Sequence, residues 1–123
     1  MGWGDQDERE SVQAIIEALE QGINWIDTAH AYGFGVSEEA VGKALREWNA
    51  DEIIVATKCG VLPQENNKPK RFISSATIRE EVEGSLKRLG RDWIDLYQIH
   101  WPEPLDNLAE SWETLQALRK EGK

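Results

Sequence analysis

The chain has 123 residues, 40% of them hydrophobic, and a formal net charge of −9. This length and composition can bury one modest core, which predicts a single small domain. The acidic balance disfavours a broad binding surface for nucleic acid or for an anionic membrane. The single cysteine, Cys59, excludes an intramolecular disulfide framework, and the first ten residues do not resemble a secretory leader, so we expect a cytoplasmic setting.

Four segments carry apolar side chains three and four residues apart, the spacing of a helix with one buried face. The first is predicted to begin at a capping pair, Asp5 and Glu8. The second opens at Ser37, and the fourth is predicted to begin at a capping Asp106. The side chains expected to face inward are Val12, Ile15, Ile16 and Leu19 in the first helix, Val41, Leu45 and Trp48 in the second, Ile78, Val82, Leu86 and Leu89 in the third, and Leu108, Trp112, Leu115 and Leu118 in the fourth.

Three short apolar runs lie between these helices, at residues 23–29, 53–57 and 94–99, and each is too short for a helix. Helices and strands therefore alternate, which is typical of a parallel sheet with right-handed crossovers. We expect residues 61–75 to form a polar loop, and most of the six tryptophans to pack helices onto the sheet. No domain boundary interrupts the alternation.

An ionisable residue stands at or beside the C-terminal end of each predicted strand. These residues are Asp27, Lys58 and His100, and Tyr32 lies in the loop after the first strand. A polar residue at one strand end is more often a turn or cap residue. In (β/α) barrels, however, this edge of the sheet gathers catalytic side chains around one opening. Because all three strands end in this way, we predict that the four residues form one site.

The four residue types fit proton delivery to a carbonyl oxygen. A free tyrosine has a pKa of about 10 and is a poor acid at neutral pH unless its phenolate is stabilised. The ammonium of Lys58 would stabilise the phenolate of Tyr32, and Asp27 would compensate the lysine charge. His100 would donate a hydrogen bond to the substrate oxygen. None of these side chains can supply hydride, so a nicotinamide cofactor is implied.

Three segments of the chain resemble the aldo-keto reductase family. The stretch GINWIDTAHAYGFGVSEEAVGKAL resembles the first family signature, IIVATKCG resembles its lysine strand, and SLKRLGRDWIDLYQIHWP resembles its histidine segment. They occur in family order and span nearly the whole chain. The resemblance implies that Tyr32 is the proton donor, Lys58 the residue that favours its ionisation, Asp27 the charge partner and a cofactor contact, and His100 the hydrogen-bond donor to substrate.

The resemblance also implies that much of the family's fold lies outside these residues. A closed (β/α)8 TIM barrel needs eight strands and about 250 residues, whereas three strands are predicted here. Residues 1–123 would then be a single incomplete barrel segment that lacks the first strand, the fifth to eighth strands and most of the NADPH site. We expect a sheet with one bare face and two open edges, and a chain that by itself self-associates and is inactive.

Other features of the sequence are assigned as follows. Trp101 and Trp3 are predicted to line the substrate pocket together with His100, and no metal site is predicted. The glycines after Tyr32 lack the spacing of a dinucleotide-binding loop, so a Rossmann fold is not expected. Two alternatives to a reductase are a cofactor-sensing subunit of a membrane channel, which shares the fold, and an aldolase that forms a Schiff base on Lys58.

Overall fold

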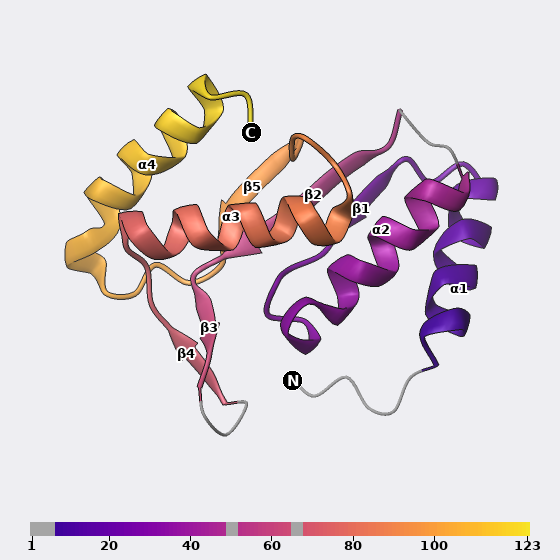
Figure 1. Ribbon diagram of the computed structural model, residues 1–123, viewed down its shortest axis with the longest axis horizontal. Coiled ribbons are helices and arrows are strands. Elements are labelled where there is room, and N and C mark those ends of the chain that lie inside the picture. Colours follow the sequence, from indigo (N-terminus) through magenta and orange to yellow (C-terminus); the bar gives the residue numbers. More distant parts are fainter. Residues whose placement is uncertain (1–6, 49–51, 65–67) are drawn as a thin grey trace.

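The computed structural model describes residues 7–48, 52–64 and 68–123. Its helices and strands follow the predicted alternation, with one additional hairpin between the second strand and the third helix (Figure 1). In chain order the elements are α1 (Glu8–Glu20), β1 (Trp25–Asp27), α2 (Val36–Trp48), β2 (Ile54–Cys59), β3 (Val61–Pro63), β4 (Pro69–Arg71), α3 (Ser75–Leu89), β5 (Leu96–Ile99) and α4 (Leu108–Lys120). Short 3-10 turns, Gly33–Gly35 and Leu105–Asn107, precede α2 and α4.

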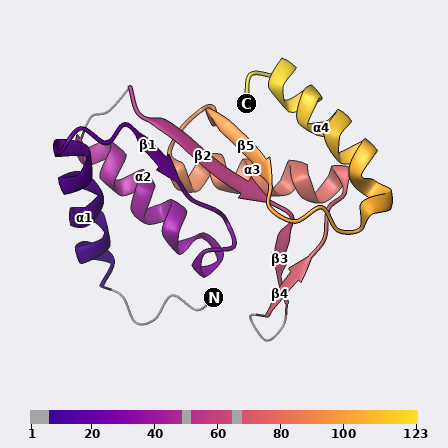
Figure 2. The ribbon, with the colours of Figure 1, turned by 180° about the vertical axis from the view of Figure 1, so that it is seen from behind.

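The main sheet is parallel, in the order β1-β2-β5. Asp27 pairs with Ala56, and Lys58 pairs with Gln98, so the C-terminal ends of the strands lie at one edge. Helices α2 and α3 lie in front of the strands in Figure 1, and the strands lie in front of α3 in the reverse view of Figure 2. The protein is therefore a partial α/β barrel fold in which helices cover one face of a parallel sheet.

Side-chain alternation along β2 separates a covered face from an open face. Val55 and Cys59 belong to the main hydrophobic core, together with side chains from α2 and α3. The intervening positions point to the other side. On that open face Trp25, Ile54 and Leu96 keep between 38% and 47% of their surface exposed. The expected bare face is thus present in the described part of the chain.

Helix ends are held by local hydrogen bonds. The side chain of Asp7 accepts a hydrogen bond from the Arg9 N–H at 2.8 Å and caps α1, while Asp5 lies outside the described residues. Ser74 and Thr77 form a capping box at the start of α3. The N-cap of α4 is Asn107, which makes no side-chain cap bond. The prediction of Asp106 as the cap was wrong, because a 3-10 turn precedes the helix and contains Asp106.

The predicted inward faces are confirmed for α3 and only in part for α2 and α4. Trp48 is 38% exposed, Leu108 39% and Trp112 59%, so these three predictions were wrong. The expectation that most tryptophans pack helices onto the sheet was also wrong, since every tryptophan in the described ranges is substantially exposed. The physical reason for Trp25 is that it projects from the face of the sheet that no helix of the described residues covers.

The predicted loop after β2 contains an antiparallel hairpin, β3–β4. Val61 pairs with Arg71, and Pro63 pairs with Pro69. The hairpin was missed because all three residues of β4 are exposed, so the sequence shows no alternation of buried and exposed side chains. The hairpin projects beyond the sheet beside the C-terminal end of β2 (Figure 2).

Candidate active site

The sheet brings Asp27, Lys58 and His100 together on its open face. Asp27 is paired with Ala56, which lies two residues before Lys58, and Lys58 is paired with Gln98, which lies two residues before His100. Residues two apart in a strand point to the same side. The register therefore gathers the three side chains at one end of the open face, as the strand-end pattern predicted.

Lys58 is the centre of this group. Its Nζ donates hydrogen bonds to Asp27 Oδ1 at 2.8 Å and to the Thr28 carbonyl at 2.9 Å. Nζ also lies 5.4 Å from the centroid of the Tyr32 ring. The lysine side chain is only 12% exposed, whereas that of Asp27 is 51% exposed. The ammonium is thus enclosed, while its carboxylate partner stays accessible at the rim.

Tyr32 reaches the site from the loop after β1. Its N–H donates to the Ala29 carbonyl at 3.0 Å, and its carbonyl accepts from the Ser37 N–H at 3.2 Å, which ties the loop to the start of α2. The Oγ atoms of Ser37 and Thr28 are 2.8 Å apart. This double attachment holds the tyrosine in a loop that is otherwise irregular.

His100 stands on the other side of the tyrosine. The two rings meet edge to face, with 5.8 Å between centroids and 85° between planes. The His100 N–H donates to the Cys59 carbonyl at 2.9 Å, which joins the ends of β2 and β5. Partial burial, aided by the Lys58 charge and opposed by Asp27, holds the pKa of His100 below its usual value. A neutral imidazole at neutral pH carries one N–H that can donate to a substrate oxygen.

Trp101 extends the aromatic surface beyond His100. The two rings stack at 6.1 Å, and the guanidinium carbon of Arg71 lies 3.9 Å from the Trp101 ring centroid. Arg71 also forms an ion pair with Glu103 at 3.1 Å. The hairpin therefore supplies a cation beside the predicted substrate wall, which the sequence did not indicate. Trp3, the other predicted wall residue, lies outside the described residues.

A second cluster of charges lies behind the site, on the covered face. The Thr57 hydroxyl donates to Glu38 Oε1 at 2.6 Å, and Arg88 Nε donates to Glu38 Oε2 at 2.7 Å. Glu38 is fully buried, and Glu81 is 6% exposed. Sequence reasoning missed both acids. The sequence did contain one indication that Glu81 is buried. It lies three residues after Ile78, in phase with the buried apolar side chains of α3.

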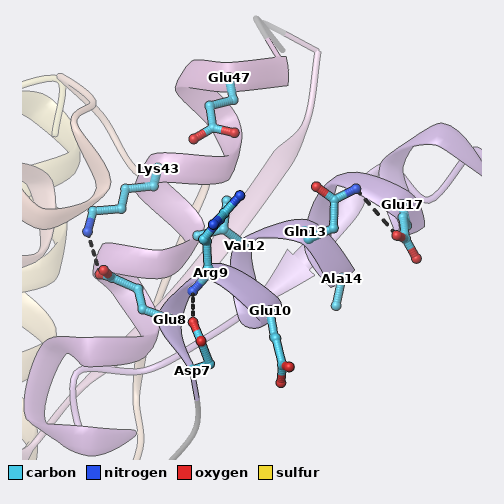
Figure 3. A pocket seen from close by; sticks show the side chains of 10 residues that line it. All are labelled: Asp7, Glu8, Arg9, Glu10, Val12, Gln13, Ala14, Glu17, Lys43 and Glu47. Carbon is cyan, nitrogen blue, oxygen red and sulfur yellow. Dashed lines mark hydrogen bonds and ion pairs between the residues drawn. The ribbon is translucent and has the colours of Figure 1, made fainter.

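An open groove lies between α1 and α2, away from the strand ends (Figure 3). Carboxylates line much of it, and an ion pair between Lys43 and Glu8 crosses it. Its described lining includes no aromatic side chain and neither Lys58 nor His100. Within the described ranges no group of His, Cys, Asp and Glu side chains could hold a metal ion. No described helix has both the length and the apolar character that crossing a membrane requires.

Comparison with known proteins gives consistent relatives. The chain is 52% identical to aldo-keto reductase YhdN of Bacillus subtilis and 39% identical to the NADH-specific methylglyoxal reductase of Escherichia coli. Each alignment covers 98% of this chain, but only 37% and 40% of the respective relative. The structure of a glycerol dehydrogenase from Gluconobacter oxydans superposes with a TM-score of 0.87 at 46% identity, over 98% of this chain and 38% of that one.

The holo form of an aldo-keto reductase from Bacillus halodurans superposes with a TM-score of 0.79 at 40% identity, over 94% of this chain and 39% of that one. The chain thus spans well under half the length of these relatives. The family model for the aldo/keto reductase family matches residues 1–123, which is the whole chain. The resemblance carried by the three sequence segments is confirmed, and this chain belongs to the aldo/keto reductase family.

Proposed function

We propose that the full-length gene product containing these residues reduces a small aldehyde or ketone to an alcohol with NADPH. The observation that carries the proposal is the geometry around Lys58. Its Nζ lies 2.8 Å from Asp27 Oδ1 and 5.4 Å from the Tyr32 ring centroid, and the His100 ring lies 5.8 Å from the same tyrosine. This arrangement places an ammonium and an imidazole beside the one tyrosine, which supports proton delivery from Tyr32 to a substrate oxygen.

The side chains have separable roles in this reaction. Tyr32 donates its hydroxyl proton to the carbonyl oxygen as that oxygen becomes an alkoxide. The Lys58 ammonium stabilises the phenolate that is left, and Asp27 balances the enclosed lysine charge. His100, kept neutral by its lowered pKa, orients the carbonyl through an N–H hydrogen bond. Trp101 forms one aromatic wall beside the carbonyl.

The residues present fit a nicotinamide cofactor at the rim of this site. When bound, the cofactor supplies the hydride that is transferred to the carbonyl carbon. Asp27 would help to hold it, because a half-exposed carboxylate can accept hydrogen bonds from cofactor hydroxyl groups. The Escherichia coli relative is named NADH-specific. Comparing hydride-transfer rates with NADPH and NADH at equal saturation tests our preference for NADPH, and faster transfer from NADH would contradict it.

Residues 1–123 are, in this proposal, one incomplete segment of a barrel whose other strands come from the rest of the gene product. The exposed apolar side chains of the open face and the greater length of the relatives support this. We therefore expect the 123 residues alone to self-associate and to show no carbonyl reduction. Light scattering and an assay of nicotinamide absorbance on this segment check both expectations. The expected cytoplasmic setting stays a prediction.

Replacing Tyr32 with Phe in the full-length gene product tests the catalytic assignment. The change removes one hydroxyl, and we expect single-turnover hydride transfer to fall about 10²- to 10⁴-fold. The matched control is Tyr97→Phe, which removes the hydroxyl of the other described tyrosine, on the covered face. Equal rates for wild type and Tyr32→Phe would contradict the role of Tyr32 and favour the cofactor-sensing alternative.

A further inference from the structure

The turn that follows β2 is held by a buried carboxylate. The N–H of Gly60, two residues after Lys58, donates to both Oε1 and Oε2 of Glu81, each at 3.1 Å. Glu81 projects from the second turn of α3, whose start is fixed by the capping box at Ser74. One side chain from a rigid helix therefore grips the backbone at the point where the lysine strand ends.

This turn also contacts the end of the histidine strand. The Cys59 carbonyl accepts the His100 N–H at 2.9 Å. Gly60 has a φ of +91°, and a Cβ at this position would lie 2.8 Å from Ile73 Cγ2 and 3.2 Å from the Trp101 carbonyl oxygen. A side chain at position 60 would therefore collide with its neighbours, so the turn requires glycine. The position of the backbone at this turn therefore influences how Lys58 and His100 lie relative to each other.

The surroundings of Glu81 supply charged or titratable groups from four elements. Glu38 comes from α2, Arg88 from α3, Cys59 from β2 and Tyr97 from β5. The pKa of Glu81 is raised to about 7, chiefly by burial and further by the charge of Glu38. The N–H groups of Gly60 and Val61 and the charge of Arg88 oppose this rise.

The cysteine and the tyrosine do not change charge in the same range. Burial raises the pKa of the Cys59 thiol to about 12. It also raises the pKa of Tyr97 well above its usual value. Both groups are therefore neutral near pH 7, where the carboxyl of Glu81 loses its proton.

We propose that Glu81 is a positioning residue for the strand-end site, because its carboxylate fixes the turn at Gly60 and so the placement of Lys58 and His100. The inference rests on the proposed reductase function and deepens it by assigning a control of that site. Glu81 lies on the covered face and acts only through the backbone. An ionised carboxylate accepts stronger hydrogen bonds than a protonated one. The rate of hydride transfer therefore rises with pH near pH 7, as Glu81 loses its proton. This rise is the acidic limb of the pH–rate profile.

The first experiment compares wild type, Glu81→Gln and Glu80→Gln in the full-length gene product by single-turnover hydride transfer from pH 5.5 to 8.5. Glu80 is the exposed neighbour on the same helix and serves as the matched control. We expect Glu81→Gln to lower the transfer rate about 10-fold and to remove the acidic limb, because small misplacements of reacting groups have effects of this order or larger. Cofactor KM should change little, and Glu80→Gln should match wild type. A wild-type rate and an unchanged limb in Glu81→Gln would overturn the proposal.

The second experiment does not depend on activity. Labelling with ¹³C-cysteine and ¹⁵N-glycine marks Cys–Gly peptide bonds such as Cys59–Gly60, and the Gly60 amide shift is followed against pH. We expect a titration near pH 7 in wild type that Glu81→Gln abolishes, and wild type alone suffices if that variant does not fold. A Gly60 amide that does not titrate overturns the proposal. A titrating amide in a protein that reduces no carbonyl supports the role of Glu81 in the turn and contradicts the reductase function.

Discussion

Each face of the main sheet carries a carboxylate paired with a cation. The two ion pairs contact β2 at consecutive residues, Thr57 and Lys58. Thr57 points to the covered face, where its hydroxyl donates to Glu38, and Glu38 accepts from Arg88. Lys58 points to the open face, where its ammonium donates to Asp27. The pairs resemble each other in distance and differ in their surroundings. Glu38 is fully buried, whereas half of the Asp27 side chain is exposed.

This difference in burial means that the two ion pairs should contribute differently to folding stability and to the reaction. Water stabilises an exposed carboxylate that has lost its partner, so removing one member of such a pair has a small effect on folding. A buried carboxylate that loses its partner keeps an uncompensated charge. We therefore expect changes in the Lys58 pair to affect the reaction, and changes in the Glu38 pair to affect the free energy of unfolding.

Of the changes that test this contrast between the faces, Lys58→Met should have the largest effect, which is a fall in the rate of hydride transfer. Methionine keeps the length of the side chain but removes the charge that we propose to stabilise the phenolate of Tyr32. We expect the single-turnover rate of the full-length gene product to fall about 10³-fold, or about 4 kcal/mol of activation free energy. Urea denaturation should show a stability change within about 1 kcal/mol. A large loss of stability together with a normal rate would reverse the assignment of the two faces.

The covered face should give the opposite result for Glu38→Gln. The variant leaves Arg88 without its ion-pair partner and weakens the bond from Thr57, so we expect a loss of about 3 kcal/mol in the free energy of unfolding. Urea denaturation of the full-length gene product measures it. Glu39→Gln, at the exposed neighbouring position, is the control and should change stability little. A loss of equal size in both variants would show that the burial of Glu38 has no special weight.

The strand-end site was predictable because it depends on a simple rule. Parallel strands present their C-terminal ends at one edge, so an ionisable residue after each strand has to lie beside the others. Asp27, Lys58 and His100 satisfy that rule, and each observed strand ends within two residues of its predicted end. The position of Tyr32 beside these residues followed from its place in the loop after β1. Sequence reasoning thus succeeded where local pattern and topology together determine position.

The remaining features depend on tertiary surroundings that the pattern does not contain. The burial of Glu38 and Glu81 is set by contacts between elements far apart in sequence, through Arg88 and the turn at Gly60. The exposure of Trp25 and Trp112 depends on which surfaces the described elements leave uncovered. Apolar residues were assigned inward because burial is their usual state, and here an uncovered sheet face changes that outcome.

Glu81 should affect stability less than Glu38 does, and it tests the contrast between the two faces most directly. It lies on the covered face and is proposed to serve the open one. Its pKa of about 7 in the folded protein lies above the ordinary value of 4.5. A raised carboxyl pKa favours the protonated folded state, so its contribution to stability is complete below about pH 4.5 and is lost as pH rises through about 7.

The stability of wild type relative to Glu81→Gln should therefore fall by about 2 kcal/mol between pH 4.5 and 8, because the folded protein binds this proton more tightly than the unfolded chain does. Urea denaturation of both proteins across this range measures it, and a difference that stays constant with pH would contradict the raised pKa. Over the same interval the hydride-transfer rate is expected to rise. Opposite trends in stability and rate would mean that a carboxylate unfavourable to the fold is kept for the geometry it gives to Gly60, as in other functional sites where activity opposes stability.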